Sequence, residues 1–278
     1  MYFRPKTLLE ATQTLAAERA QILAGGTDFF PALGERRVQG TVMDVSGISE
    51  LKGITREKEW LRIGGLTTWS EVIAAPLPRC LDGLKLAARE IGGVQIQNRG
   101  TVAGNLCNSS PAADGVPPLL ALNSEVELVS SIGMRRLPLS EFIAGNRQTL
   151  RRADEVLTYV YVPLGLEGAA STFLKLGARR YLVISIAMVA VALKADASGN
   201  ICDARIAVGS CSVKAQRLAE LEHSLIGMPA TAGVGAAVTA QHLSHLAPID
   251  DVRATADYRR AAALTLVARA LDACARSC

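Results

Sequence analysis

Two glycine-rich stretches carry the residue types that hold phosphate. The first reads Ala24-Gly25-Gly26-Thr27-Asp28, and the second reads Asn-Arg-Gly-Thr-Val-Ala-Gly-Asn over residues 98–105. Glycines let the chain turn sharply and bring consecutive N–H groups close to an anion, while Thr and Asn side chains add neutral donors. Two such cradles suit the two phosphates of a pyrophosphate, so the pair predicts a dinucleotide cofactor.

The spacing of these glycines excludes the two commonest phosphate-binding folds. Neither stretch reads G-x-G-x-x-G or G-x-x-x-x-G-K-[ST], so neither a Rossmann fold nor a P-loop is expected. Each stretch alone could be a tight turn between a strand and a helix. The polar residues that continue the second stretch, up to Ser110-Pro111-Ala112-Ala113-Asp114, favour a binding loop over a simple surface turn.

The chain offers little for acid–base or nucleophilic catalysis. Asp114 is the only carboxylate in the stretch 92–115, no histidine lies near it in the sequence, and no Ser–His or Cys–His pairing is evident. Cys107 lies inside the second stretch and could have a redox role or simply pack beside a ligand. No catalytic residue is therefore predicted, and holding a cofactor is the favoured task.

Metal binding is also poorly supported. His242 and His245 stand at i, i+3 on an expected helix, but no third ligand accompanies them, which favours a surface pair. The six cysteines show no C-x-x-C spacing, so neither a zinc ribbon nor an iron–sulfur loop is expected and free thiols are predicted.

Length and composition indicate a globular protein with two lobes. The chain has 278 residues, of which 49% are hydrophobic and 20% charged. Its net charge of +4 is spread over scattered arginines without interleaved aromatics, so nucleic acid is not an expected partner. The N-terminus lacks an apolar signal region, and the longest apolar run, residues 181–193, is too short to span a bilayer. These features predict a cytoplasmic protein without a transmembrane segment.

Hydrophobic periodicity predicts alternating strands and helices. A helix over residues 7–20 is followed by a strand at 21–24, the first glycine stretch and a short helix at 28–33. Residues 92–115 are expected to form an ordered loop without regular structure. The other expected elements are helices at 68–73, 83–91, 118–122, 181–186, 220–222, 230–240 and 258–274, and strands at 41–45, 60–64, 125–129, 135–139, 155–163, 187–194 and 201–209.

Five ordered motifs carry a resemblance to a known family. The sequence is similar to the flavin-binding medium subunits of the xanthine dehydrogenase and carbon monoxide dehydrogenase family of molybdenum hydroxylases. The departure is Ala103, where the family usually has a glycine; its methyl group is tolerable if φ is negative there. The motifs that carry the resemblance are Ala24–Asp28, Arg62–Thr68, Asn98–Asn105, Ser110–Asp114 and Arg179–Ser185.

The resemblance implies an α+β fold in which FAD lies extended between two subdomains. The expected fold is an FAD-binding type 2, PCMH-like domain over residues 1–165, divided into subdomains at about 1–54 and 55–165. A smaller C-terminal α+β domain of antiparallel sheet and helices follows at 166–278.

The same resemblance implies which residues contact FAD. Tyr181 or Leu182 is expected to help shield the flavin, and Lys175 is expected on a strand face, either solvated or near the flavin ring. The expected cofactor-binding residues are Ile22, Leu23, Ala24, Gly25, Gly26, Thr27, Asp28, Thr101, Ala103, Gly104, Asn105, Cys107, Asn108, Ala113, Asp114, Leu157 and Lys175.

The partners follow from the family as well. The resemblance implies a large molybdenum-cofactor subunit and a small [2Fe–2S] subunit, as a dimer of heterotrimers, with this chain passing electrons to an external acceptor. A second interpretation is a scaffold that kept the fold without flavin. The substrate of the complex and the identity of the acceptor are not written in this sequence.

Overall fold

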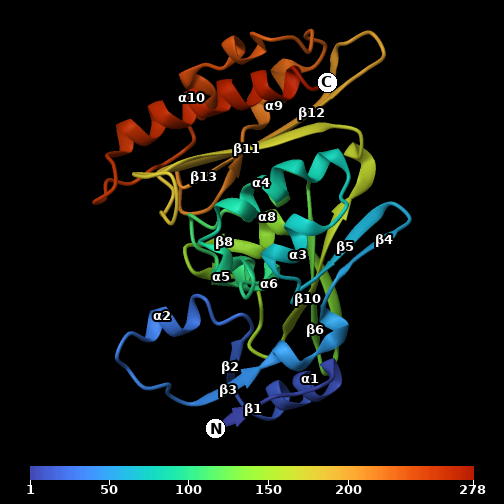
Figure 1. Ribbon diagram of the computed structural model, residues 1–278, viewed down its shortest axis with the longest axis vertical. Coiled ribbons are helices and arrows are strands. Elements are labelled where there is room, and N and C mark those ends of the chain that lie inside the picture. Colours follow the sequence, from blue (N-terminus) through green and yellow to red (C-terminus); the bar gives the residue numbers. More distant parts are fainter.

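The computed structural model describes residues 1–278 and stacks three bodies along its long axis (Figure 1). The N-terminal subdomain, residues 2–51, lies at one end, and the middle subdomain, residues 54–163, follows it. The C-terminal domain, residues 170–275, caps the other end. The predicted α+β class is confirmed. None of the helices combines the length and apolar character needed to cross a bilayer.

The N-terminal subdomain is a small parallel sheet with a helix packed on it. Helix α1 begins after Thr7, whose side chain accepts the Glu10 amide, and it buries Ala11 and Leu15. The expected helix at 7–20 and strands at 21–24 and 41–45 are thus confirmed with bounds shifted by a few residues. The sheet order is β1-β3-β2. The elements are β1 (Tyr2–Phe3), α1 (Leu8–Ala17), β2 (Ala20–Leu23), α2 (Phe29–Leu33) and β3 (Thr41–Asp44).

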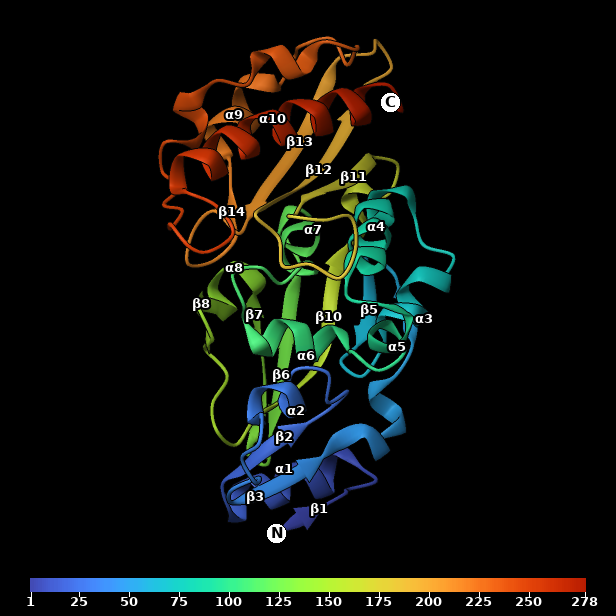
Figure 2. The same ribbon diagram turned by 60° about the vertical axis from the view of Figure 1, so that its left-hand side comes forward.

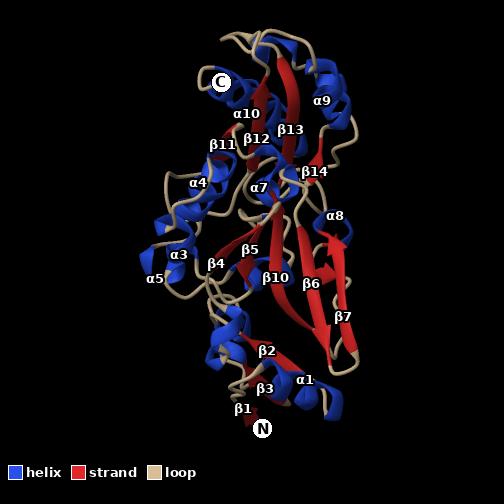
Figure 3. Ribbon diagram, turned by 90° about the vertical axis from the view of Figure 1, so that its right-hand side faces the viewer, coloured by secondary structure: helices blue, strands red, loops and turns tan.

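The middle subdomain is a five-stranded antiparallel sheet of order β4-β5-β10-β6-β7 with helices packed against it (Figure 3). A separate two-stranded hairpin, β8-β9, lies beside it. The strands are β4 (Ile54–Glu57), β5 (Trp60–Gly64), β6 (Glu125–Ser130), β7 (Gly133–Pro138), β8 (Ile143–Gly145), β9 (Gln148–Thr149) and β10 (Val156–Pro163), and the helices are α3 (Trp69–Ala74), α4 (Asp82–Glu90), α5 (Val94–Gln97), α6 (Val102–Asn108), α7 (Val116–Ala121) and α8 (Leu139–Phe142).

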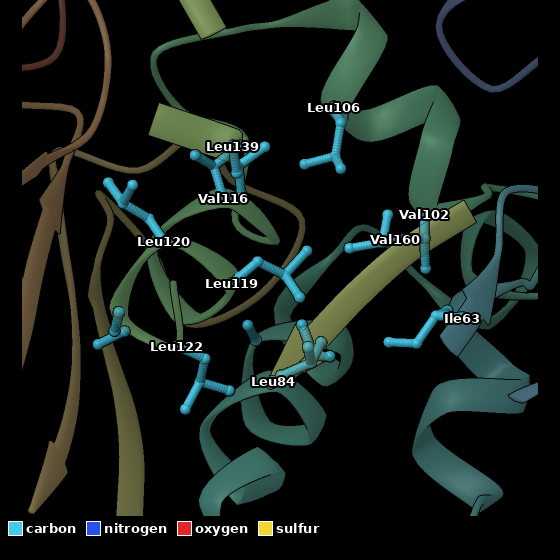
Figure 4. Close-up of a cluster of buried hydrophobic side chains, with 14 of the residues drawn as sticks. Ile63, Leu84, Val102, Leu106, Val116, Leu119, Leu120, Leu122, Leu139 and Val160 are labelled. Atoms are coloured by element: carbon cyan, nitrogen blue, oxygen red, sulfur yellow. The ribbon is translucent and has the colours of Figure 1, made fainter. Parts of the chain in front are cut away.

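The largest hydrophobic core lies in this subdomain. Figure 4 shows side chains from α4, α6, α7 and β10 converging there, among them Leu84, Leu106, Leu119 and Val160, all fully buried. Because aromatic residues are scarce, aliphatic side chains supply nearly all of this packing. The core fixes α6 against β5 and β10.

The prediction that residues 92–115 lack regular structure is wrong. They contain α5 and α6, and α6 runs through the second glycine stretch. Thr101 caps α6 by accepting the Gly104 amide at 3.0 Å, and Val102 and Leu106, one turn apart, are fully buried. Tertiary packing of this apolar stripe outweighs the low helix propensity of glycine and asparagine.

The C-terminal domain is an antiparallel sheet of order β11-β12-β13-β14 with helix α10 across it (Figure 2). Strand β12 is apolar along almost its whole length because α10 covers one face and α7 approaches it from the middle subdomain. The elements are β11 (Ala170–Leu176), β12 (Ala187–Ala195), β13 (Ile201–Gly209), β14 (Gln216–Arg217), α9 (Ala219–Leu225) and α10 (Ala256–Ala275).

Two helices expected in this domain are corrected. Residues 181–186 are irregular, because Leu182 takes a φ of 53° and the Arg179 guanidinium bonds the carbonyl oxygens of Tyr181 and Leu182. Residues 230–240 form the 3-10 turn Val234–Ala237 and the start of a second one, Ala240–Leu243, instead of an α-helix.

Truncating Leu84 should destabilise the protein strongly. Leu84→Ala removes a fully buried side chain from α4, so we expect the free energy of unfolding to fall by about 2–5 kcal/mol. Leu86→Ala on the same helix is the matched control, because 37% of Leu86 is already exposed, and should cost about 1 kcal/mol at most. Guanidinium denaturation followed by tryptophan fluorescence measures both. Equal losses would contradict the assigned core.

Candidate functional site

A cavity of about 890 Å³ lies between the N-terminal and middle subdomains. Its volume falls in the range of cofactor and ligand sites. Both glycine stretches line it, the first from the N-terminal subdomain and the second from α6. The lining residues are Ile22, Ala24–Phe29, Val45, Leu51, Gly65, Leu66, Trp69, Ile91, Gly100, Thr101, Ala103–Asn105, Cys107, Asn108, Ala144, Arg147–Thr149, Arg151, Val156 and Leu157.

The first stretch is a turn between β2 and α2 with unpaired backbone donors. Gly26 has a φ of 76°, a left-handed conformation that glycine adopts without strain. The four consecutive amides of residues 25–28 donate to no acceptor in the protein. Consecutive unpaired N–H groups at a cavity wall are the arrangement that binds an anion.

The second stretch differs, because its backbone amides are already used. The Val102 and Ala103 amides donate to the carbonyl oxygens of Thr67 and Gly65, at 3.0 and 3.1 Å, and the Gly104 amide donates to Thr101. Its available groups are side chains, including the Thr101 hydroxyl, which has no acceptor in the protein. The two stretches are therefore not equivalent cradles. The first offers backbone amides, and the second offers side chains.

Asn105 carries the one unsatisfied buried side-chain atom among the lining residues. Its Oδ1 atom is buried and receives no hydrogen bond, although the residue lines the cavity. A buried carbonyl oxygen without a donor costs about 1–3 kcal/mol. The atom has almost no accessible surface and lies beside Gly115, which is outside the cavity lining, so it is not exposed to the cavity.

Gly25 brings the two stretches together. A Cβ atom at this position would lie 1.9 Å from the carbonyl oxygen of Arg99, a distance that only glycine permits. The backbone is similarly close at Gly65, where an added Cβ atom would lie 2.6 Å from the carbonyl oxygen of Leu157. Ala103 does not disturb this packing, because it lies in α6 with a negative φ.

Cys107 stands half-buried at the cavity wall. Desolvation raises the pKa of its thiol to about 11, against a smaller lowering by Arg151. The sulfur is therefore protonated at neutral pH and is a poor nucleophile. This state fits packing beside a ligand better than redox chemistry.

Four of the expected contacts lie outside the cavity lining: Leu23, Ala113, Asp114 and Lys175. Lys175 is not solvated, because its Nζ atom pairs with the Asp114 carboxylate at 2.9 Å and both side chains are almost completely buried. Ser185 donates to the other Asp114 oxygen at 3.0 Å. Burial raises the Asp114 pKa despite these partners. Tyr181 and Leu182 are both more than half exposed.

Sequence reasoning missed the β8-β9 hairpin, which lines the cavity with Ala144, Arg147, Gln148 and Thr149. Local signals there are weak, since the strands have only three and two residues. The Gly145-Asn146-Arg147 sequence is a turn signal that could have drawn attention to the arginine. In the histidine pair, His242 has a structural role, because its Nδ1 atom accepts the Thr239 amide at 3.1 Å and closes a 3-10 turn.

Fold and site together define a class of protein, one with an anion-binding cavity at the junction of two α+β subdomains, outside the Rossmann and P-loop folds. A family model for the FAD binding domain in molybdopterin dehydrogenase matches residues 1–165, and a model for the CO dehydrogenase flavoprotein C-terminal domain matches residues 172–274. The chain belongs to this family, the FAD-binding medium subunits of molybdenum hydroxylases, and FAD is its cofactor.

Individual relatives agree with this assignment. The chain is 34% identical to the nicotinate dehydrogenase FAD-subunit of Eubacterium barkeri, over 83% of this chain and 80% of that protein. It is 30% identical to the carbon monoxide dehydrogenase medium chain of Hydrogenophaga pseudoflava, over 100% of this chain and 97% of that protein. A solved carbon monoxide dehydrogenase from Hydrogenophaga pseudoflava superposes with a TM-score of 0.91 over 100% of this chain and 97% of that chain, at 30% identity.

Gly25→Ala should abolish stoichiometric FAD binding. The added methyl group cannot occupy the space of the Arg99 carbonyl, so the two stretches must move apart. Gly168→Ala is the control, because a Cβ there meets no atom within 4 Å. FAD released by denaturation is quantified per chain, with circular dichroism as the check of folding. Normal FAD content in folded Gly25→Ala would contradict the close approach.

Cys107 should resist alkylation at neutral pH. Because its pKa is raised to about 11, we expect slow reaction with iodoacetamide at pH 7 to 8, and acceleration only as the pH approaches about 11. The exposed Cys202 is the internal reference. Peptide mass spectrometry of the folded, flavin-free protein follows both sites, and equal rates at pH 8 would contradict the protonated, shielded state.

Proposed function

We propose that this chain holds FAD in the cavity between its N-terminal and middle subdomains and passes electrons from a partner's [2Fe–2S] clusters to an external acceptor. The observation that carries the proposal is the run of four unpaired amides at residues 25–28 on the cavity wall. A flavin suits the task because it accepts electrons singly and can release them in pairs.

The residue roles follow from the donors that each stretch offers. We assign the FAD diphosphate to the backbone amides of Gly25, Gly26, Thr27 and Asp28. The Thr101 hydroxyl contributes a neutral hydrogen bond from α6. The other residues expected from the sequence, including those outside the cavity lining, remain predicted contacts.

The buried pair Asp114–Lys175 has a positioning role in this proposal. It connects the loop before α7 to strand β11 and, through Ser185, to the segment before β12. This connection fixes the C-terminal domain on the middle subdomain. We place the domain boundaries where the sequence predicts them, near residues 54 and 165, at the start of β4 and between β10 and β11.

We extend the proposal to the assembly. Relatives of this chain are described as medium chains or FAD-subunits of dehydrogenases, which supports partners that carry the other redox groups. We propose a large molybdenum-cofactor subunit and a small [2Fe–2S] subunit, as a dimer of heterotrimers, with an external acceptor. A cytoplasmic location remains a prediction. The scaffold alternative is disfavoured because the cavity wall keeps the unpaired amides of residues 25–28.

The absorption spectrum of the purified chain tests the cofactor directly. We expect the visible bands of an oxidised flavin, bleaching on reduction, and release of about one equivalent of FAD and no FMN. Adding FAD in hundredfold excess over its dissociation constant to flavin-free protein should stabilise the fold by about 2.7 kcal/mol, measured by thermal shift. A colourless protein that takes up no FAD on reconstitution would instead support the scaffold.

A further inference from the structure

The β8-β9 turn is attached to helix α6 by one buried serine. Ser109 ends α6 in a left-handed conformation with a φ of 48° and is 1% exposed. Its carbonyl oxygen accepts the Arg147 amide at 2.8 Å, and its Oγ atom lies 2.7 Å from the Gly145 carbonyl oxygen and 3.1 Å from that of Gln148. Both ends of the turn are therefore fixed, and Arg147 projects from a rigid base.

The Arg147 side chain joins the two sides of the cavity. Its Nη1 atom donates to the Asp28 carboxylate at 2.9 Å, at the start of α2, and also to Oδ1 of Asn108 on α6. The backbone of Arg147 takes a φ of 54°, a conformation uncommon for a residue other than glycine. The rigid turn thus directs the guanidinium toward the first glycine stretch.

Charge on the cavity wall is concentrated in three residues, Asp28, Arg147 and Arg151. The Arg151 Nη1 atom is already bound to the carbonyl oxygens of Arg152 and Glu155. Arg147 also donates only through its Nη1 atom, but its partner there is the Asp28 carboxylate, at the end of the run of unpaired amides. Arg147 is therefore the lining cation whose side chain is held next to the first glycine stretch, and it neutralises the one carboxylate beside the unpaired amides.

We propose that Arg147 is the cationic contact of the FAD diphosphate, held in place by Asp28, Asn108 and the Ser109-anchored turn. A guanidinium presents its donors as a planar fork that matches two oxygens of one phosphate. This inference rests on the proposed function, because it assigns a residue to the same cofactor. It explains why a carboxylate is tolerated at an anion site, since Arg147 balances the Asp28 charge.

Arg147→Gln tests the contact in the full-length, flavin-free chain. Because a hydrogen bond to a charged group contributes about 1.5–3 kcal/mol, FAD affinity should fall by about tenfold or more, measured by calorimetry at low and high salt. The salt dependence of FAD binding should also weaken. Arg56→Gln is the matched control, because Arg56 is equally exposed and also ion-paired, but lies outside the cavity. Arg147→Lys keeps the charge and should bind FAD better than Arg147→Gln.

Chemical footprinting provides a readout that needs no variant. Phenylglyoxal should modify Arg147 in the flavin-free chain, and saturating FAD should protect Arg147 while Arg56 stays reactive. Unchanged FAD affinity in Arg147→Gln, or an Arg147 that FAD leaves unprotected, would overturn the inference while wild-type FAD binding stands. If wild-type protein binds no FAD at all, the proposed function fails first and this inference fails with it.

Discussion

The close approach of Gly25 to the Arg99 carbonyl is the constraint on which the site depends. The first glycine stretch belongs to a parallel sheet and the second to a helix on an antiparallel sheet, so the two can share a cavity only where their backbones nearly touch. A single hydrogen atom in place of a side chain makes this contact possible. The residues with unpaired amides and Arg147 then line the same cavity.

Helix α6 organises the other side of that cavity. Its buried stripe packs on β5 and β10, its first amides bond the segment after β5, and its C-terminal Ser109 holds the β8-β9 turn. The helix thus acts mainly as a rigid support, and it presents side chains instead of free amides. A similar rigid connection, the buried Asp114–Lys175 pair, fixes the C-terminal domain to the middle subdomain. Such a pair is stable only because each charge has further hydrogen-bond partners.

Most elements could be predicted from local pattern, and the errors have physical causes. Thr7, which precedes apolar residues at helical spacing, correctly predicts the start of α1, and the apolar run at 187–194 correctly predicts strand β12. The stretch 92–115 was expected to be irregular because glycine and asparagine disfavour helix, yet burial of Val102 and Leu106 decides otherwise. At 181–186 the expected helix does not form, since the apolar side chains of Tyr181, Leu182 and Ile184 stay exposed and gain no packing from a helix.

The sequence by itself determined where the glycines, caps and apolar stripes lie, and therefore the α+β class and the two stretches that line the site. Only the tertiary structure decided which amides remain unpaired, because the acceptors at Gly65 and Thr67 belong to a different segment of the chain. It also brought Arg147 to Asp28 across more than a hundred residues. Hydrogen-bond partners that are distant in sequence are set by the packing of whole elements, and no local pattern encodes that packing.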